Sequence, residues 1–272
     1  MDLSRASTFL FVPGDRPERF DKAQASGADV VIIDLEDGVA PSQREKARAH
    51  VVSWLSTGRQ AAVRISAIGT EDHLLDLAAL RCGIEAVVVP KSESAADLAR
   101  VASALSNEVK IVALIETARG VVEATNLAAA TAVVRLALGN VDLAAEIGVD
   151  PDDHQALLHV RSQLSLASSA AGLTGPIDGV TTAIRDTHRV HADAQHGASL
   201  GFRGKLCIHP HQVSQARAGL APSAQQVAWA ESILAEVANG AARVVGEAMV
   251  DRPVEERARD ILWRSGHRRD AD

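Results

Sequence analysis

Cysteine is nearly absent from the chain, which has 272 residues and only Cys82 and Cys207 as thiols. Two isolated cysteines exclude a disulfide framework and are typical of proteins from reducing compartments. No apolar run approaches the ~20 residues that a membrane-spanning helix needs. The first residues also lack the basic and apolar segments of a signal peptide. We therefore expect a cytoplasmic protein that does not associate with membranes.

An excess of basic residues is also missing, because 28 lysines and arginines face 35 acids, for a net charge of −7. This balance argues against non-specific nucleic-acid binding but leaves room for a local basic pocket. The segment PGDRPERF is not a GxxxxGK phosphate loop, although it can present Arg16 to an anion. CIHPHQ holds too few ligands for zinc, so we interpret His209 as a packed or hydrogen-bonded residue.

Eight short apolar runs are present, and they alternate with amphipathic segments that have helical spacing. The runs are residues 9–12, 30–35, 62–65, 86–89, 111–115, 133–138, 177–180 and 206–208. The clearest helical segments are 41–55, 71–80, 95–105 and 153–170. Such alternation predicts parallel strands with crossover helices. Eight units match an α/β fold of the TIM (β/α)8 barrel type, and a doubly wound open sheet is the alternative.

The last part of the chain has a different pattern. We predict a barrel domain over residues 1–220 and a C-terminal helical extension, or lid, over 221–272. A helix is expected at 224–238, with Ser223 as its N-cap and Gly240 as its stop. Residues 244–250 then lead into Asp251 and a charged last helix.

Charged or polar residues stand where the apolar runs end. The carboxyl ends of barrel strands share one face, on which barrel enzymes build their active sites. The residues expected on this face are Arg16, Asp34, Glu36, Asp37, Arg64, Lys91, Glu116, Asp142 and His209.

Glu116 and Asp142 end neighbouring runs, so a strand spacing of ~4.8 Å places them roughly 5 to 10 Å apart. Two unpaired carboxylates would raise the free energy of the folded protein on this partly buried face, the rim formed by the carboxyl ends of the strands. Mg²⁺ resolves this cost, because it accepts one or two protein carboxylates and completes its shell with water and substrate. Alternatively, Glu116 pairs with Arg119 or Arg64, and the spacing leaves both interpretations open.

Arg64 lies within the strand-length run AAVRIS, and its planar fork suits a substrate carboxylate. The alternative for Arg64 is an ion pair with a rim acid, namely Glu36, Asp37 or Glu116. Lys91 either binds an anion or is solvated.

Three acids are close together in IIDLEDGV. Asp34 and Glu36 share one strand face, so they need a cation, an arginine or water. Asp37 alternatively caps the turn or helix that follows.

Eight segments occur in a fixed order and cover about residues 8 to 255. They are FVPGDRPERF, VVIIDLEDGVAP, VRIS, VVVPKSES, ALIETARG, ALGNVDLAAEIG, KLCIHPHQ and EAMVDRPV. Together they resemble the citrate lyase β-subunit-like proteins, the CoA-ester lyase branch of the HpcH/HpaI aldolase superfamily. The resemblance implies a TIM barrel that cleaves or forms carbon–carbon bonds beside a CoA thioester, with Mg²⁺ or Mn²⁺ as the metal.

The resemblance also assigns roles to residues. Glu116 and Asp142 correspond to the metal ligands, and Arg64 corresponds to the clamp for the oxo-acid carboxylate. Asp251 corresponds to an acid/base residue on a lid that reaches the site of a neighbouring subunit. The remaining assignments place Glu36 and Asp37 in the catalytic group, where they order metal-bound waters or hold Arg64, and Arg16, Lys91 and Asp34 on the substrate or CoA surface.

The reaction implied is cleavage or condensation of a β-hydroxy acyl-CoA, such as citramalyl-CoA, malyl-CoA or citryl-CoA. Its products are an acyl-CoA and glyoxylate, pyruvate or oxaloacetate, and the implied assembly is a homotrimer or hexamer. The alternatives are a CoA-independent aldolase of hydroxy-oxo acids, a citryl-ACP lyase subunit and a non-catalytic paralogue. Many relatives have an acid where this chain has Val141, which weakens the likeness to the citrate lyase complex itself.

Overall fold

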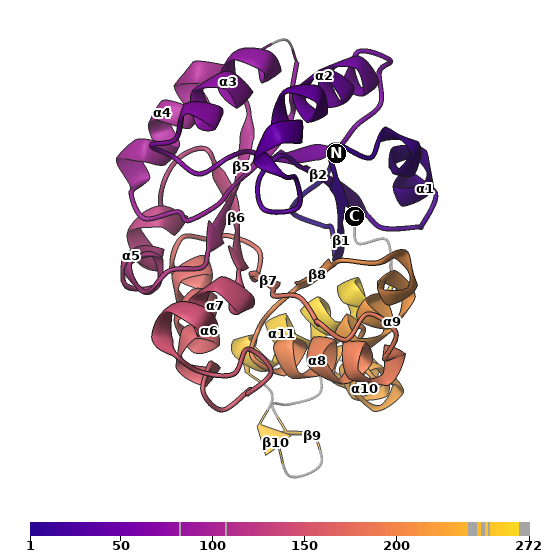
Figure 1. Cartoon of the computed structure of the whole chain (residues 1–272). Coiled ribbons are helices and arrows are strands. Elements are labelled where there is room, and N and C mark those ends of the chain that lie inside the picture. Colours follow the sequence, from indigo (N-terminus) through magenta and orange to yellow (C-terminus); the bar gives the residue numbers. More distant parts are fainter. Residues whose placement is uncertain (82, 107, 239–243, 246–247, 250, 267–272) are drawn as a thin grey trace. The chain divides into compact units, whose positions relative to one another are not determined.

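The structure is a computed structural model, and it describes residues 1–81, 83–106, 108–238, 244–245, 248–249 and 251–266 (Figure 1). The chain divides into two compact units, Met1–Leu220 and Ala221–Asp272. None of the helices in the described residues is long and apolar enough to cross a membrane.

The first unit is built on a closed barrel of eight parallel strands. The strands are β1 (Thr8–Pro13), β2 (Val30–Asp34), β3 (Ala62–Arg64), β4 (Ala86–Val89), β5 (Lys110–Ile115), β6 (Val133–Leu138), β7 (Ile177–Asp178) and β8 (Gly204–Cys207). Pairing of β1 with β8, in register from Thr8 and Lys205, closes the barrel. The predicted (β/α)8 fold is confirmed, and this closure rules out the open sheet.

Helices surround the strands (Figure 1). They are α1 (Phe20–Gln24), α2 (Arg44–Leu55), α3 (Glu71–Leu80), α4 (Ala95–Leu105), α5 (Ala118–Ala128), α6 (Asn140–Ile147), α7 (Leu158–Ala170), α8 (Thr187–Ser199) and α9 (Pro210–Leu220). Short 3₁₀ turns at Pro17–Arg19 and Pro41–Gln43 precede α1 and α2. Thr70, Ser94 and Thr117 cap α3, α4 and α5 by accepting a backbone N–H.

The helix predicted from residue 153 begins later, at Leu158. The Asp153 carboxylate accepts the backbone N–H groups of Gln155 and Ala156 at 2.8 and 3.2 Å. This local turn competes with the helix, which is a known property of aspartate side chains. The predicted start was therefore wrong by about one turn and a half.

The core has two layers, because parallel barrel strands are buried on both faces. Between strands and helices lies the larger layer, which includes Leu10, Ile33 and Ile115. Inside the barrel lies a smaller layer, which includes Phe9 and Val112. These two layers explain why the strands are nearly uninterrupted apolar runs.

Arg135, on β6, is buried at the N-terminal end of the barrel. Its Nη1 donates hydrogen bonds to the carbonyl oxygens of Leu3 and Ala6 at 2.9 and 3.2 Å. Its guanidinium carbon lies 5.8 Å from the centre of the Phe9 ring. The first residues of the chain therefore close this end of the barrel around a charged group.

The second unit contains α10 (Ala224–Ala238), the antiparallel strands β9 (Val244–Val245) and β10 (Ala248–Met249), and α11 (Arg252–Arg264). Ser223 caps α10 as predicted, since its Oγ accepts the Gln226 N–H at 3.2 Å. Ala230, Ile233, Ala258 and Ile261 form a small core between α10 and α11. Gly240, the predicted stop, lies outside the described residues. The lid function of this unit stays a prediction.

Candidate active site

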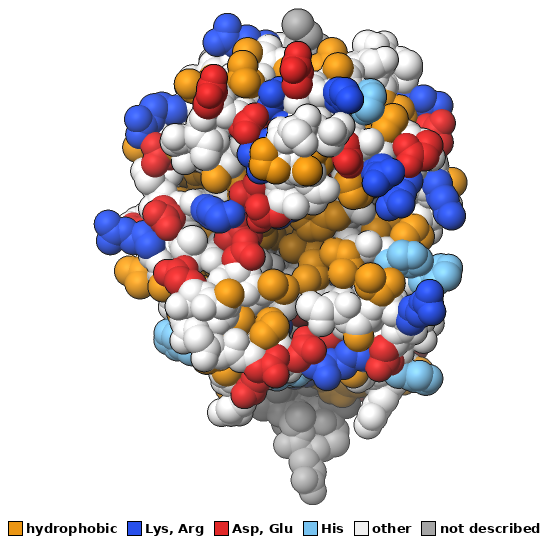
Figure 2. Space-filling view, viewed as in Figure 1, with side chains coloured by type: hydrophobic (Ala, Val, Ile, Leu, Met, Phe, Trp, Pro, Cys, Tyr) orange, Lys and Arg blue, Asp and Glu red, His pale blue; other side chains and the backbone are white. Residues whose placement is uncertain are grey.

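A cavity of about 320 Å³ opens at the carboxyl ends of the strands. Acidic side chains gather on one side of a hollow with a hydrophobic floor (Figure 2). The apolar lining residues include Phe11, Leu114, Leu138, Val141, Val180, Leu206 and Ile208. The polar ones are Asp34, Asp37, Arg64, Glu116, Asn140 and Asp142. The cavity therefore contains most of the residues predicted at the strand ends.

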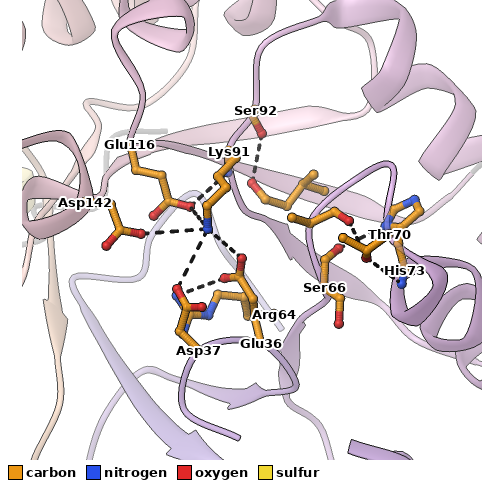
Figure 3. Close-up of polar contacts among 12 residues, drawn as sticks. Glu36, Asp37, Arg64, Ser66, Thr70, His73, Lys91, Ser92, Glu116 and Asp142 are labelled. Atoms are coloured by element: carbon orange, nitrogen blue, oxygen red, sulfur yellow. Dashed lines mark hydrogen bonds and ion pairs between the residues drawn. The ribbon is translucent and has the colours of Figure 1, made fainter. Parts of the chain in front are cut away.

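Glu116 directly follows β5 and is only 3% exposed. A Cβ at Gly139 would overlap the Glu116 side chain, so glycine at the end of β6 is needed for this packing. Burial, followed by the negative charge of Glu36, raises the pKa of Glu116 to about 7. Asp142 lies beside Glu116 in the first turn of α6, where the helix dipole favours a negative charge (Figure 3).

Lys91 stands among four carboxylates (Figure 3). Its Nζ lies 2.8 Å from Glu36 Oε1, 3.8 Å from both Asp37 Oδ2 and Glu116 Oε1, and 3.9 Å from Asp142 Oδ2. Burial lowers the pKa of Lys91, but the hydrogen bond and charge of Glu36 outweigh burial and raise it. The ammonium is thus the cation that links these acids.

The backbone of Lys91 has a φ of 47°. This left-handed conformation is costly for a residue with a side chain, and such strain is concentrated at functional sites. It directs the Lys91 N–H to Glu116 Oε1 at 2.9 Å. Both the backbone and the side chain of Lys91 are therefore committed to the acidic rim.

Arg64 is held by Asp34, its register partner on the neighbouring strand β2. Arg64 Nε and Nη2 donate to Asp34 Oδ1 and Oδ2 at 2.7 and 2.6 Å, and Nη1 lies 3.4 Å from Glu36 Oε2. Burial lowers the pKa of Arg64, but the hydrogen bonds and charge of Asp34 raise it overall. The ion pair with Glu36 was considered from the sequence, whereas the stronger pair with Asp34 was missed.

Asp34 also shapes the loop after β2. Its carboxylate accepts the N–H groups of Glu36 and Gly38 at 3.0 and 2.8 Å. A Cβ at Gly38 would overlap Asp34 Oδ2, so the glycine lets the loop fold tightly over the carboxylate. Glu36 Oε2 is buried and has no hydrogen-bond partner among the described residues. Burial, partly offset by Arg64, raises the pKa of Glu36.

Glu116 forms its ion pair with Lys91 instead of with Arg119 or Arg64. Arg16 lies on the loop after β1, where it is exposed and 4.0 Å from Asp15, outside the set of cavity-lining residues. His209 accepts the His211 N–H at 3.2 Å, consistent with a hydrogen-bonded residue.

Asp251 belongs to the second unit, where it caps α11 by accepting the Val254 N–H at 3.2 Å. Its catalytic role stays a prediction.

Asn140 was not identified from the sequence as a site residue. Its side chain accepts the Val180 N–H at 2.8 Å and donates to the Val180 carbonyl at 3.1 Å. A Cβ at Gly179 would overlap this amide. Asn140 thereby joins the ends of β6 and β7 and fixes the first turn of α6, which carries Asp142. The only signals in the sequence were the glycines at 139 and 179.

The rim suits a divalent metal ion. It offers carboxylate oxygens, which Mg²⁺ prefers. One of them, Glu36 Oε2, lies 3.4 Å from Arg64 Nη1 but has no hydrogen-bond partner among the described residues. Within the described part of the chain, no three His, Cys, Asp or Glu side chains are grouped as a metal site. A cation there would be held by Glu116 and Asp142, whose carboxylates both lie close to Lys91 Nζ, and water or substrate would complete its shell.

Residues 7–210 match the family model described as HpcH/HpaI aldolase/citrate lyase. The chain belongs to this family. The match confirms the resemblance drawn from the eight ordered segments.

Relatives of known name match nearly the whole chain. A citrate lyase subunit beta-like protein of Mycobacterium tuberculosis is 40% identical over 267 residues, or 95% of each chain. A (3S)-malyl-CoA thioesterase of Cereibacter sphaeroides is 34% identical over 91% of this chain and 88% of its own.

Among solved structures, protein CitE from Mycobacterium tuberculosis, in complex with magnesium, acetoacetate and coenzyme A, superposes with a TM-score of 0.87. It is 39% identical, and the match covers 97% of this chain and 100% of that one.

Proposed function

We propose that this protein is a Mg²⁺-dependent carbon–carbon lyase that cleaves a β-hydroxy acyl-CoA into an acyl-CoA and an oxo acid, or condenses them in reverse. The observation that carries the proposal is the cavity that Glu116, Asp142 and Arg64 line together with apolar side chains. Support comes from the similar CitE structure, which contains magnesium, acetoacetate and coenzyme A. We also propose that residues 1–220 are the catalytic domain.

Glu116 and Asp142 are the residues that would hold the metal. When bound, Mg²⁺ supplies a Lewis acid that orients the hydroxyl and carboxylate of the substrate and neutralises charge on the departing oxo acid. Glu36 and Asp37, on the loop after β2, are positioned to order waters in its shell. The apolar floor limits water at the carbon atoms that separate.

Arg64 binds the carboxylate of the oxo acid. Asp34 occupies its Nε and one hydrogen of its Nη2. The other edge of the guanidinium, whose Nη1 lies 3.4 Å from Glu36 Oε2 without a hydrogen bond to it, can form a bidentate pair with the substrate. Asp34 thus orients the clamp, and the clamp orients the scissile bond, which is how positioning residues accelerate a reaction. Lys91 and Arg16 are further candidates for contacts with the anionic parts of the substrate.

Cleavage moves one proton at each end of the bond. A base accepts the hydroxyl proton, the carbon–carbon bond breaks as the C=O of the oxo acid forms, and the bond electrons pass to the thioester enolate. An acid then protonates the enolate carbon. We assign the proton transfer to Asp251, placed by the lid of a neighbouring subunit in a homo-oligomer.

Subunit complementation tests this assignment. Asp251→Asn and Glu116→Ala should each be inactive alone, yet a mixture in which the subunits have exchanged should recover part of the activity. No recovery after exchange has been verified by mass spectrometry would exclude a shared site.

A second candidate function is hydrolysis of the thioester, which the relative named (3S)-malyl-CoA thioesterase favours. The products distinguish the two reactions. A lyase releases an oxo acid and an acyl-CoA in equal amounts, whereas a thioesterase releases a hydroxy acid and the free thiol of CoA.

The deciding experiment incubates the protein with malyl-CoA, citramalyl-CoA and citryl-CoA, with Mg²⁺, with Mn²⁺ and with a chelator. We expect metal-dependent release of glyoxylate, pyruvate or oxaloacetate from at least one thioester, measured by chromatography of both products. Free thiol without oxo acid would favour hydrolysis. Cleavage of free hydroxy-oxo acids, but of no thioester, would overturn the CoA-ester assignment.

A further inference from the structure

Lys91 stands where the proposed metal ion would be expected. Its ammonium lies 3.8 Å from Glu116 Oε1 and 3.9 Å from Asp142 Oδ2, the two side chains assigned to the metal (Figure 3). It also lies 2.8 Å from Glu36 Oε1, which is the shortest of its side-chain contacts with the acids. One nitrogen therefore contacts acids that come from three different strand ends.

The charges on this rim do not balance. Five carboxylates are present, namely Asp34, Glu36, Asp37, Glu116 and Asp142. Two cations face these five acids. Arg64 makes two hydrogen bonds to Asp34 and lies 3.4 Å from Glu36 Oε2, whereas the Lys91 ammonium contacts the other four acids. Five carboxylates against two cations leave the rim short of positive charge, and Glu36 Oε2 has no hydrogen-bond partner among the described residues.

A metal ion and the Lys91 ammonium cannot both occupy this position. Mg²⁺ binds oxygens at about 2.0 to 2.1 Å in an octahedral shell, which would place it next to the nitrogen that now contacts the same oxygens. An ammonium carries three donors and no acceptor, so it cannot be a ligand. Two like charges at such a distance repel strongly in a partly buried site.

The side chain of Lys91 is free to leave while its backbone stays. The side chain is 40% exposed and ends a flexible stem of four carbons. The backbone N–H donates to Glu116 Oε1 independently of the ammonium. Departure of the ammonium therefore clears the centre of the rim without releasing Glu116.

We propose that the Lys91 ammonium is a built-in counter-ion that holds the acidic rim together without metal and that a divalent cation displaces it. This inference rests on the proposed metal site of Glu116 and Asp142. It makes Lys91 a positioning residue that lowers the affinity for the metal, because each binding event must break the contacts of the ammonium. It also explains how four acids remain close together before the metal arrives.

Calorimetry of the chelator-treated full-length protein tests the proposal. Lys91→Met removes the charge and retains much of the chain length, so we expect Mg²⁺ to bind about tenfold more tightly than to the wild type. Lys91→Arg keeps the charge and should bind no more tightly than the wild type. Lys46→Met, which removes an exposed lysine on α2, is the matched control and should bind like the wild type.

Thermal unfolding gives a second readout. Without metal, Lys91→Met should unfold at a lower temperature than the wild type, since its four acids lose their cation. Saturating Mg²⁺ should remove most of that difference.

Reductive methylation of the wild type, followed by mass spectrometry, needs no variant to fold. Lys91 should react slowly without metal and faster with saturating Mg²⁺, whereas Lys46 should react equally in both conditions.

The outcomes separate this inference from the proposed function. Mg²⁺ binding to Lys91→Met with wild-type or weaker affinity, or a methylation rate of Lys91 that Mg²⁺ leaves unchanged, would overturn the role of Lys91 and leave the metal site standing. Absence of Mg²⁺ binding to the wild type and to every variant would overturn the metal site and the inference together.

Discussion

The two ends of the barrel bury arginine in different surroundings. At the N-terminal end, Arg135 donates to two backbone carbonyls and has no hydrogen-bond partner for Nε and Nη2 among the described residues. Burial, with the charge of Arg203, lowers the pKa of Arg135 to about 9. At the C-terminal end, Arg64 is matched by Asp34, and further acids stand beside it.

The two ends differ in the sign of their uncompensated charge and in whether a ligand can reach that charge. At the N-terminal end, the uncompensated charge is the positive charge of Arg135, and Leu3 and Ala6 in the first residues of the chain contact it through their carbonyl groups. The C-terminal end has an excess of negative charge, and it borders a cavity of about 320 Å³ that can admit a cation. Uncompensated buried charge is costly at both ends, but only at the cavity can a ligand neutralise it.

Loss of a metal ligand at the cavity should have the largest effect. Asp142→Asn preserves shape and removes one charge, and we expect kcat/KM to fall on the order of 10³-fold, since metal stabilisation of transition-state charge is worth several kcal/mol. Steady-state kinetics over a Mg²⁺ titration measure the loss. Glu45→Gln, at an exposed position on α2, is the control. Wild-type kinetics in Asp142→Asn would remove Asp142 from the metal site.

Removal of Arg64 should cost stability as well as activity. Arg64→Met leaves the Asp34 carboxylate buried without its partner, a change that typically costs about 3 to 5 kcal/mol. Urea unfolding of the chelator-treated protein measures it. The double variant Arg64→Met/Asp34→Asn should regain part of the loss, because neither charge remains. If Arg64→Met were as stable as the wild type, the pair of Arg64 and Asp34 would contribute little to the free energy of unfolding.

The pH dependence of stability should reveal Glu116. Its pKa is about 7 in the folded, metal-free chain against an ordinary value of 4.5. The folded state therefore binds the proton more tightly, and stability present below pH 4.5 is lost as the pH rises through 7. The shift corresponds to an effect on the order of 3 kcal/mol.

Urea unfolding in chelator from pH 4.5 to 8 should show this decline in the wild type and a smaller one in Glu116→Gln. If the free energy of unfolding fell equally steeply with pH in the two proteins, the pKa of Glu116 would be ordinary.

The smallest effect on stability is expected at the N-terminal end of the barrel. Arg135→Met removes a buried charge but also the donors to two carbonyls, and these opposing changes should leave a net effect of at most about 2 kcal/mol. Mg²⁺ affinity should be unchanged by calorimetry. A loss of stability larger than that of Arg64→Met would reverse the comparison between the two ends.

Local patterns predicted the barrel and the charged residues that line the cavity, but they did not identify Asn140 and they also included Arg16, which lies outside the lining. The apolar runs predicted all eight strands, because a strand buried on both faces needs apolar residues throughout. Polar residues at the ends of those runs predicted the rim, since the carboxyl ends of parallel strands share a face. The start of α7 was missed because one aspartate formed a local turn.

Partnerships within the rim were not predictable in the same way. The pair of Asp34 and Arg64 depends on strand register, which brings residues 30 positions apart face to face. The central place of Lys91 depends on a left-handed backbone at a residue other than glycine, which the sequence does not signal.

The sequence by itself determined the fold class, the family and the set of charged residues at the strand ends, because each of these follows from local composition and order. Only the tertiary structure decided which acid Arg64 pairs with and which cation stands between Glu116 and Asp142. Those choices depend on distances of a few ångströms among side chains from different strands. Closure of the barrel sets these distances, and no segment of the chain encodes them alone.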